Sequence, residues 1–415
     1  MVEINQNLLD QLYDKYKDLP LLINEKQCWT FAEFFNEAYL ISNSLSTDPQ
    51  KRIGLCSENL EFLLLAMMAI WMREAIVVPL NPKFPARQKE ELLRKVKCDI
   101  TLSENYTRTN SQSQITRGMP LLNPDAWSTI IFTSGSSGFP KAVVHTLANH
   151  FFSALGANKI MPLKPGDRWL MSLPLFHVGG LAILFRSLLS GSSIVIPAKK
   201  KTLIQNIEEN QITHLSLVPT QLQRLLKTGK GRKSLHKMKL ILLGGSAIPE
   251  SLMEHSSKLG LKLRTTYGST EMASQVATSR PIKTKKGWLA AGEVLPFCEV
   301  RIAPQNEIEL RGNTLFCGYL SESGLSQPFD NQGWFSSGDT GYLIKKNNET
   351  NLQKIDLENK TKKPQLAAKN DYLIVSGRKD SMFISGGENI HPEEIERSLL
   401  QFQDTERVAV VAVKD

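Results

Sequence analysis

Long apolar runs, clustered cysteines and a leader-like start are all lacking in this sequence. The most apolar stretch, residues 62–80, is interrupted by Arg73 and Glu74 and closed by Pro79. It predicts a buried helix followed by a strand and excludes a membrane span. The five cysteines are widely spaced without a Cys-x-x-Cys pair, which argues against a zinc site or a disulfide framework. With no basic-then-apolar signal pattern at the start, we expect a cytoplasmic protein without membrane insertion.

Two well-known nucleotide-binding patterns are also absent. No Gly-x4-Gly-Lys-Ser/Thr sequence forms a Walker A loop, and no Gly-x-Gly-x-x-Gly follows a strand. The net charge of +9 comes from lysines scattered through polar stretches, without interleaved aromatic residues. Nucleic acid is therefore not an expected partner, whereas a mild basic excess suits anionic small substrates.

The chain is long enough to form about two or three domains with a sizeable core. Its 415 residues are 41% hydrophobic and 22% charged, as in an ordinary globular protein. Apolar runs alternate with helix-like stretches, which predicts an α/β fold with two mostly parallel, αβ-layered sheets. The expected strands cover residues 53–55, 75–80, 100–102, 129–132, 169–173, 193–197, 215–218 and 240–243.

From about residue 287 the pattern changes to short strands separated by turn signals. Residues 293–302, 307–311, 334–344 and 372–375 predict a small β-rich subdomain over about 287–376. Within it, residues 345–370 are polar and nearly free of large apolar side chains. We interpret them as an exposed excursion between two strands.

The most informative segment is Thr-Ser-Gly-Ser-Ser-Gly-Phe-Pro-Lys at residues 133–141. It follows an apolar, β-branched run that predicts a buried strand. Its glycines allow a tight turn that presents backbone N–H groups, its hydroxyls add donors, and Lys141 adds a positive charge. Such a loop suits a polyphosphate, although composition alone is equally compatible with a surface turn.

Further motifs follow in a fixed order along the chain. They are Pro-Leu-Phe-His-Val-Gly-Gly at 174–180, Tyr-Gly-Ser-Thr-Glu at 267–271, Ser-Gly-Asp-Thr-Gly at 337–341, Ser-Gly-Arg-Lys-Asp at 376–380 and the segment 384–396. Together with the loop, they resemble the adenylate-forming superfamily of acyl-CoA synthetases, adenylation domains and luciferases. The resemblance runs from about Thr30 to the end of the sequence.

The resemblance implies an ATP-binding site. Glu271 would be the Mg²⁺ ligand, since a carboxylate is a hard oxygen ligand for a hard ion. Tyr267 would pack on the adenine and Asp339 would accept both ribose hydroxyls. The implied ATP or AMP contacts are Thr133, Ser134, Gly135, Ser136, Ser137, Gly138, Lys141, Gly245, Ser246, Tyr267, Gly268, Asp339 and Arg378.

The implied catalytic residues are His177, Thr270, Glu271 and Arg378. Thr270 would contact the α-phosphate, and Arg378 would donate to the ribose or the phosphate. Several of the site residues also have an ordinary structural interpretation, which for Tyr267 is packing in or beside the core. Glu271 would serve as a helix-capping carboxylate, Asp339 as a turn residue, Arg378 as a surface charge and His177 as a structural hydrogen-bonding group.

More particular segments resemble the o-succinylbenzoate–CoA ligases of menaquinone biosynthesis. They are residues 172–180, 185–191, 213–221, 242–249 and 384–396. The substrate of that family is an aromatic dicarboxylate, and Arg186 is a cation inside an apolar run. We hypothesise that it orients the carboxylate that does not react; otherwise it pairs with a core acid or reaches the surface. The expected substrate contacts are His177, Arg186, Thr220, Gly244 and Gly245.

The resemblance also implies the domain organisation. Residues 1–376 would form the N-terminal AMP-binding domain and 377–382 a hinge containing Asp380. Residues 383–415 would begin a truncated, small α+β C-terminal subdomain, without the family's Pro-x4-Gly-Lys segment. The co-substrates would be a carboxylate, ATP with Mg²⁺, and CoA, and a homodimer is compatible with the family. Another aryl- or acyl-CoA ligase, a stand-alone adenylation enzyme and a silent nucleotide-binding protein remain alternatives.

Overall fold

A computed structural model describes most of the chain. The described residues are 3–45, 47–104, 118–133, 140–284, 287–289, 291–345, 364–368, 371–379, 383–385, 388–390, 395–396, 399, 408 and 410–411. They divide into two compact units. Unit 1 comprises residues 1–212, 269–274 and 313–328, and unit 2 comprises residues 213–268, 275–312 and 329–415.

One sheet of unit 1 has the strand order β20-β19-β7-β6-β4-β3-β5. Its parallel part is β5, β3, β4 and β6, whereas β7, β19 and β20 add antiparallel pairs. An antiparallel pair needs no crossover connection, and β19 and β20 are joined by a short turn. The bounds are β3 Arg52–Leu55, β4 Ile76–Pro79, β5 Ile100–Leu102, β6 Trp127–Thr133, β7 Lys141–Thr146, β19 Gly318–Ser321 and β20 Gly324–Ser326.

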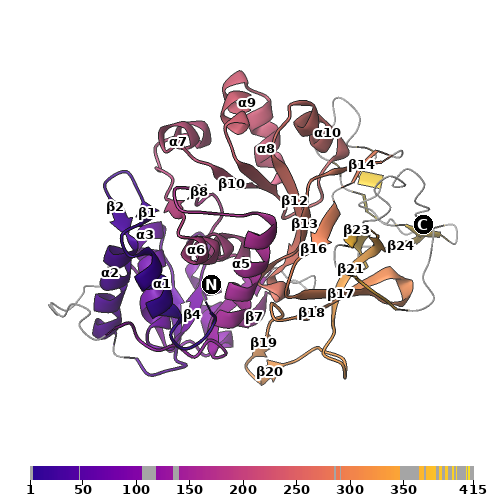
Figure 1. Ribbon diagram of the computed structural model, residues 1–415. Helices are drawn as coiled ribbons and strands as arrows, with labels where there is room; N and C mark the ends of the chain where they lie inside the picture. Colours follow the sequence, from indigo (N-terminus) through magenta and orange to yellow (C-terminus); the bar gives the residue numbers. More distant parts are fainter. Residues whose placement is uncertain are drawn as a thin grey trace. The chain divides into compact units, whose positions relative to one another are not determined.

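A second group of unit 1 strands has the order β2-β1-β9-β8. The bounds are β1 Pro20–Ile23, β2 Cys28–Thr30, β8 Arg168–Leu170 and β9 Ser193–Val195. Helices α2 and α3 contact each other, as do α5 and α6 (Figure 1). The helices of unit 1 are α1 Leu8–Tyr16, α2 Phe31–Ser44, α3 Leu60–Trp71, α4 Ala86–Lys95, α5 Leu147–Ile160, α6 Val178–Ser190 and α7 Leu203–Glu209, with the 3₁₀ turn η1 Thr270–Met272.

Unit 2 joins a parallel layer to an antiparallel one. Strands β10, β11 and β12 are parallel neighbours, and the order continues β13-β16-β23-β21-β18-β17-β22 with antiparallel pairs. The bounds are β10 His214–Leu217, β11 Leu240–Leu243, β12 Leu263–Ser269, β13 Ser274–Ser279, β16 Ala291–Val294, β17 Cys298–Ile302, β18 Glu307–Gly312, β21 Phe335–Ile344, β22 Gln365–Leu366 and β23 Tyr372–Arg378.

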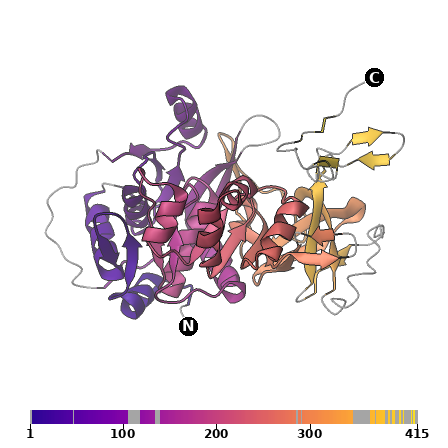
Figure 2. The same cartoon turned by 90° about the horizontal axis from the view of Figure 1, so that it is seen from above.

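Smaller elements complete unit 2. A separate hairpin, β24 with β25, is visible as two yellow arrows in Figure 2. Helices α8 and α9 contact each other. The remaining bounds are α8 Pro219–Leu226, α9 Gly229–His236, α10 Glu250–Lys258, η2 Pro304–Asn306, β14 Ile282–Thr284, β15 Gly287–Leu289, β24 Phe383–Ser385 and β25 Glu388–Ile390.

The predicted α/β fold is confirmed, and local sequence explains several of its elements. Thr30 caps α2, since its hydroxyl accepts a hydrogen bond from the Glu33 N–H at 3.1 Å. The Glu33 carboxylate returns the bond to the Thr30 N–H at 2.7 Å, which completes a capping box. The apolar run at 62–80 forms buried α3 followed by β4, as predicted. None of the helices in the described ranges is long and apolar enough to span a membrane.

The β-rich part differs from its prediction in one strand. The single strand expected over 293–302 is wrong, because the structure forms β16 and β17 with an interruption at Phe297. Phe297 has a φ of +71°, which no extended strand accommodates. The excursion at 345–370 lies largely outside the described residues, although β22 within it pairs with β17. The domain boundaries at 376 and 382 stay predictions.

Candidate active site

Lys141 and Thr133 stand opposite each other in unit 1, where β6 ends and β7 begins. Thr133 ends β6, Lys141 begins β7, and the two are registered partners in the antiparallel pair. The intervening residues of the predicted phosphate loop, Ser134, Gly135, Ser136, Ser137 and Gly138, lie outside the described residues. The Lys141 ammonium is exposed and lies 4.8 Å from the centroid of the Tyr319 ring. The hairpin thus presents a cation beside the loop.

Glu271 lies on η1 with its backbone and side chain both hydrogen-bonded. Its carbonyl accepts the Phe316 N–H at 2.8 Å. Its Oε1 accepts the Tyr319 hydroxyl, also at 2.8 Å. In the described part of the chain, no hydrogen bond or ion pair reaches Oε2. A carboxylate held through Oε1 in this way is suited to ligate a hard cation through Oε2.

A buried histidine supports the preceding residue, Thr270. Nε2 of His145 lies 2.7 Å from the Thr270 carbonyl oxygen. Because a carbonyl oxygen only accepts hydrogen bonds, Nε2 carries a hydrogen and is the donor. Burial lowers the pKa of His145 to about 4, which keeps the imidazole neutral. The His150 ring packs against the His145 ring, with centroids 4.9 Å apart. His150 also forms a hydrogen bond of 2.7 Å with the Thr129 hydroxyl through Nε2. This pair of neutral rings was not predicted from the sequence.

His177 occupies the position immediately before α6. It is exposed, its ring contacts Phe176 edge-on at 4.7 Å, and partial desolvation lowers its pKa. Its carbonyl accepts the N–H groups of Gly180 and Leu181 at the start of the helix. A Cβ at Gly180 would lie only 2.1 Å from the Pro174 carbonyl oxygen, so the turn that presents His177 requires glycine there.

Arg186 lies inside unit 1, on α6. Only 1% of the residue is exposed, so the alternative in which it reaches the surface is wrong. Its guanidinium lies 5.1 Å from the centroid of the Trp169 ring. Burial lowers the pKa of Arg186 to about 9, which still leaves the side chain protonated at neutral pH. A cation buried this deeply favours a nearby anion.

Several predicted residues of unit 2 gather at one edge of its parallel layer. Strands β10, β11 and β12 run in register, so their carboxyl ends share an edge. The predicted site residues lie at the carboxyl end of one of these strands or in the segment that follows it. Ligands bind at such edges in open α/β sheets. The residues are Thr220 on α8, Gly244, Gly245 and Ser246 after β11, and Tyr267 and Gly268 on β12.

Asp339 is held from two sides in unit 2. The Tyr267 hydroxyl donates to its Oδ2 at 2.6 Å, and the Arg378 guanidinium lies 3.2 Å from its Oδ1. Arg378 also donates to the Ser337 carbonyl at 3.3 Å. A carboxylate has about four lone-pair positions, so it can accept further donors such as ribose hydroxyls. The structure therefore brings three predicted nucleotide contacts of unit 2 together.

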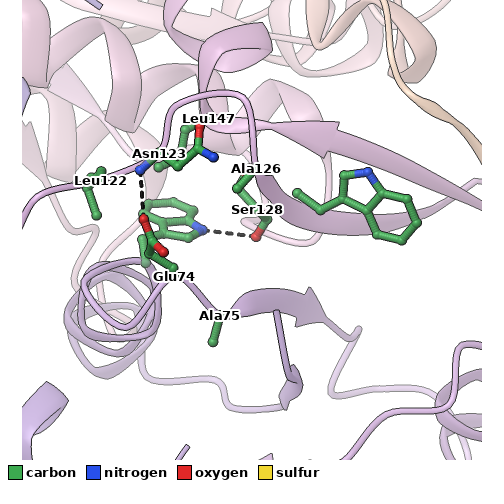
Figure 3. Close-up of a pocket in the computed structure, with 9 residues that line it drawn as sticks. Glu74, Ala75, Leu122, Asn123, Ala126, Ser128 and Leu147 are labelled. Carbon is green, nitrogen blue, oxygen red and sulfur yellow. Dashed lines mark hydrogen bonds between the residues drawn. The ribbon is translucent and has the colours of Figure 1, made fainter. Parts of the chain in front are cut away.

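None of these predicted site residues lines the pocket in Figure 3. It is lined by residues including Glu74, Leu122 and Ser128, and it has room for about one water molecule. The Asn123 N–H donates to Glu74, and the Trp71 indole donates to the Ser128 carbonyl at 3.0 Å (Figure 3). It is a packing gap in unit 1. The predicted hinge residue Asp380 lies outside the described residues.

Sequence reasoning missed Tyr319, Phe316 and His145. Tyr319 is 48 residues from the carboxylate that it contacts. It lies on a short strand where alternation alone suggests ordinary packing. A signal in the sequence was the neighbouring Gly318, because a glycine within a strand often marks an irregularity. In the structure Gly318 has a φ of +143°, and a Cβ there would lie 2.4 Å from the Ser326 carbonyl oxygen.

The donor set fits the magnesium ion that the resemblance implies. No cluster of three or more His, Cys, Asp or Glu side chains suited to a metal occurs among the described residues. Mg²⁺ commonly binds one or two carboxylates, substrate phosphates and water rather than an all-protein cage. The open oxygen of Glu271 is compatible with that mode.

Comparisons with known proteins identify the family of the chain. The family model described as AMP-binding enzyme matches residues 9–120 and 104–320. The 2-succinylbenzoate–CoA ligase of Salmonella typhimurium is 35% identical over 361 residues. That match covers 85% of this chain and 71% of the relative.

Two solved structures of o-succinylbenzoate CoA synthetase from Bacillus subtilis also resemble the chain, each at 26% identity. One, with the acyl-adenylate OSB-AMP, has a TM-score of 0.81 and covers 99% of this chain and 86% of that one. The other, with ATP and magnesium, has a TM-score of 0.80 and covers 99% and 87%. The chain belongs to the AMP-binding enzyme family, the adenylate-forming enzymes that include the 2-succinylbenzoate–CoA ligases.

Proposed function

We propose that this protein is an ATP-dependent acid–thiol ligase that converts o-succinylbenzoate and CoA to o-succinylbenzoyl-CoA. A carboxylate oxygen of the acid attacks the α-phosphorus of ATP, giving the acyl-adenylate and pyrophosphate. The thiol sulfur of CoA then attacks the acyl carbon, the acyl–oxygen bond breaks, and AMP leaves. This places the enzyme in menaquinone biosynthesis. The contact of Lys141 and Glu271 with one tyrosine, Tyr319, carries the proposal, since it joins a phosphate-binding cation to a metal-binding carboxylate.

In the first step the protein positions the reactants and balances charge. Lys141 and the adjoining loop bind the β- and γ-phosphates, and Glu271 ligates Mg²⁺, which neutralises phosphate charge. Thr270 contacts the α-phosphate. No side chain forms a covalent bond, so rate enhancement comes from alignment and electrostatic stabilisation. The neutral His145 supports this alignment by holding the Thr270 carbonyl.

The nucleoside is bound by residues of unit 2. Asp339 accepts the ribose hydroxyls while Tyr267 and Arg378 fix its two oxygens. Gly245, Ser246 and Gly268 provide backbone next to the nucleotide at the strand edge. Tyr267 places its ring against the adenine. These roles agree with an adenylate that stays bound between the two steps.

Arg186 provides the selectivity for a dicarboxylate. The guanidinium remains charged although it is buried. A negatively charged group of the substrate therefore binds to it more favourably than a neutral group of the same size. The carboxylate that does not react is that group, held directly or through a water molecule. The resemblance also implies substrate contacts for His177, Thr220 and Gly244, with His177 near the entry of the thiol. We further propose CoA as the thiol, a homodimeric assembly and a cytoplasmic location.

Product analysis tests the proposal. The protein is incubated with ATP, Mg²⁺, CoA and o-succinylbenzoate, beside benzoate and fatty-acid controls, and acyl-AMP and thioester are detected by mass spectrometry. Selective formation of o-succinylbenzoyl-CoA is expected. Activity on a control acid alone would retain the ligase class and contradict the substrate. Binding of ATP without either product, also when preformed acyl-AMP is supplied, would favour a silent nucleotide-binding protein.

A further inference from the structure

Tyr319 contacts two charged side chains, those of Lys141 and Glu271. The face of its ring lies against the Lys141 ammonium, at 4.8 Å from the centroid. Its hydroxyl donates to Oε1 of Glu271 at 2.8 Å. Lys141 and Glu271 form no direct ion pair in the described part of the chain. One neutral side chain thus has the cation on its face and the carboxylate at its hydroxyl.

Regular structure fixes the position of Tyr319. It lies on β19, whose residues pair with β7 so that Tyr319 is opposite Val143. The Cys317 N–H donates to the Val144 carbonyl at 2.8 Å, just before the strand begins. The ring of Phe316 packs edge-on against Tyr319 with centroids 4.8 Å apart. A side chain anchored on a strand in this way holds its contacts more accurately than one on a loop.

The backbone at Glu271 is fixed independently of its side chain. The Thr270 carbonyl accepts His145, and the Glu271 carbonyl accepts the Phe316 N–H. The chain then continues through Ala273 at φ +50° and Ser274 at φ +129°, two strained conformations without glycine. Strain of this kind persists only where surrounding contacts determine the backbone, and it is concentrated at functional sites. What remains adjustable is the direction of the Glu271 carboxylate.

We infer that Tyr319 is a positioning residue that prepares Glu271 and Lys141 for the magnesium complex of ATP. Its hydroxyl fixes the carboxylate through Oε1 and leaves Oε2 to meet the ion. Its ring provides Lys141 with a neutral partner, so the ammonium is not drawn into an ion pair with Glu271 before the phosphates arrive. The inference rests on the proposed function, because it assumes that ATP and Mg²⁺ bind here.

Tyr319→Phe tests the hydroxyl, because it keeps the ring. The matched control is Tyr16→Phe, which removes a hydroxyl bonded to the Leu189 carbonyl at 2.9 Å, elsewhere in unit 1. ATP binding is measured by calorimetry over a range of Mg²⁺ concentrations, with no acid or CoA present. Mn²⁺ binding in the presence of ATP is followed by electron paramagnetic resonance.

For Tyr319→Phe we expect the Mg²⁺ concentration at half-maximal ATP binding to rise about five- to tenfold, the net effect of losing one ordinary hydrogen bond. Tyr16→Phe should leave it unchanged, even if both variants lower the unfolding temperature. Tyr319→Leu should in addition weaken ATP binding at saturating Mg²⁺, because Lys141 loses the ring.

A second comparison keeps the inference testable if Tyr319→Phe loses stability. In the background of Glu271→Gln, the further change Tyr319→Phe should have no additional effect on the Mg²⁺ dependence, because both act through the same carboxylate. An unchanged Mg²⁺ dependence in folded Tyr319→Phe, or full additivity with Glu271→Gln, would overturn the inference alone. Absence of Mg²⁺-dependent ATP binding in the unaltered protein would overturn it together with the proposed function.

Discussion

Asp339 on β21 and Arg378 on β23 are registered opposite each other, and their side chains form an ion pair of 3.2 Å. Gly338, at φ +75°, precedes the carboxylate, and a Cβ there would lie 3.2 Å from the guanidinium. The two predicted nucleotide contacts, 39 residues apart, are therefore brought together by strand pairing. Their exposure differs, because 14% of the Asp339 side chain is accessible against 44% for Arg378. The carboxylate is therefore the more buried partner of the pair, and the guanidinium the more exposed one.

Asp339→Asn should raise the KM for ATP by roughly 10- to 100-fold, because the amide is a weaker acceptor for ribose hydroxyls than the carboxylate. Steady-state kinetics at saturating acid and CoA measure this change. Asp330→Asn is the matched control, since Asp330 also forms an ion pair with an arginine, Arg301, at 2.7 Å. Equal effects of the two substitutions would contradict a nucleotide contact at Asp339.

Arg186→Leu should raise the KM for o-succinylbenzoate by roughly 10- to 100-fold while leaving that for ATP nearly unchanged. Leucine removes the cation and keeps an apolar side chain at this buried position, and thermal unfolding checks that the variant is folded. Arg52→Leu is the control, because it removes a half-buried arginine of unit 1 that bonds the Val96 carbonyl. Full catalytic efficiency in Arg186→Leu would refute the assignment of the spectator carboxylate.

Acid should destabilise the protein through His145. Burial lowers its pKa in the folded state to about 4, against 6.5 for the free side chain. The unfolded chain therefore binds the proton first, and stability is lost as pH falls from 6.5 towards 4, by at most about 3 kcal/mol. Urea unfolding at pH 7 and pH 5 measures the loss.

His145→Gln should reduce this pH dependence, since the amide can still donate to Thr270 but does not titrate. Part of the dependence remains, because burial also lowers the pKa of His150 well below its usual value. His236→Gln, on the exposed side of α9, is the control and should keep the original dependence. An identical loss between pH 7 and pH 5 in all three proteins would show that His145 is not responsible.

Gly180→Ala should destabilise unit 1 by roughly 2 kcal/mol or more and reduce activity, because the added methyl group meets the Pro174 carbonyl and displaces His177. Thermal unfolding and the KM for CoA provide the readouts. Gly229→Ala is the control, since a Cβ there would meet only the Arg232 side chain, at 3.9 Å. Matching unfolding temperatures for the two variants would contradict the close approach at Gly180.

Local sequence predicted much of this architecture because many of its signals act over a few residues. The capping pair Thr30 and Glu33 is three positions apart, and the apolar run that forms α3 and β4 is continuous. The family resemblance that the motifs carry implied that Asp339 and Arg378 belong to one site, and the structure brings their side chains together. These features need no knowledge of the tertiary fold.

Other features depend on contacts that no local pattern encodes. The role of Tyr319 follows from pairing of β19 with β7, and only the fold places its hydroxyl on Glu271. The burial of Arg186 against Trp169 could not be distinguished from surface exposure by sequence, since either suits a single cation in an apolar run. The break at Phe297 depends on a positive φ that bulky residues rarely adopt.

The central claim is that the acid is activated as an acyl-adenylate. It is tested most directly with o-succinylbenzoate whose carboxylate oxygens are labelled with ¹⁸O, followed by mass spectrometry of the AMP formed with CoA. Attack of the carboxylate on the α-phosphorus predicts one ¹⁸O atom in the phosphate of each AMP. Unlabelled AMP, or ADP with labelled inorganic phosphate, would contradict the account.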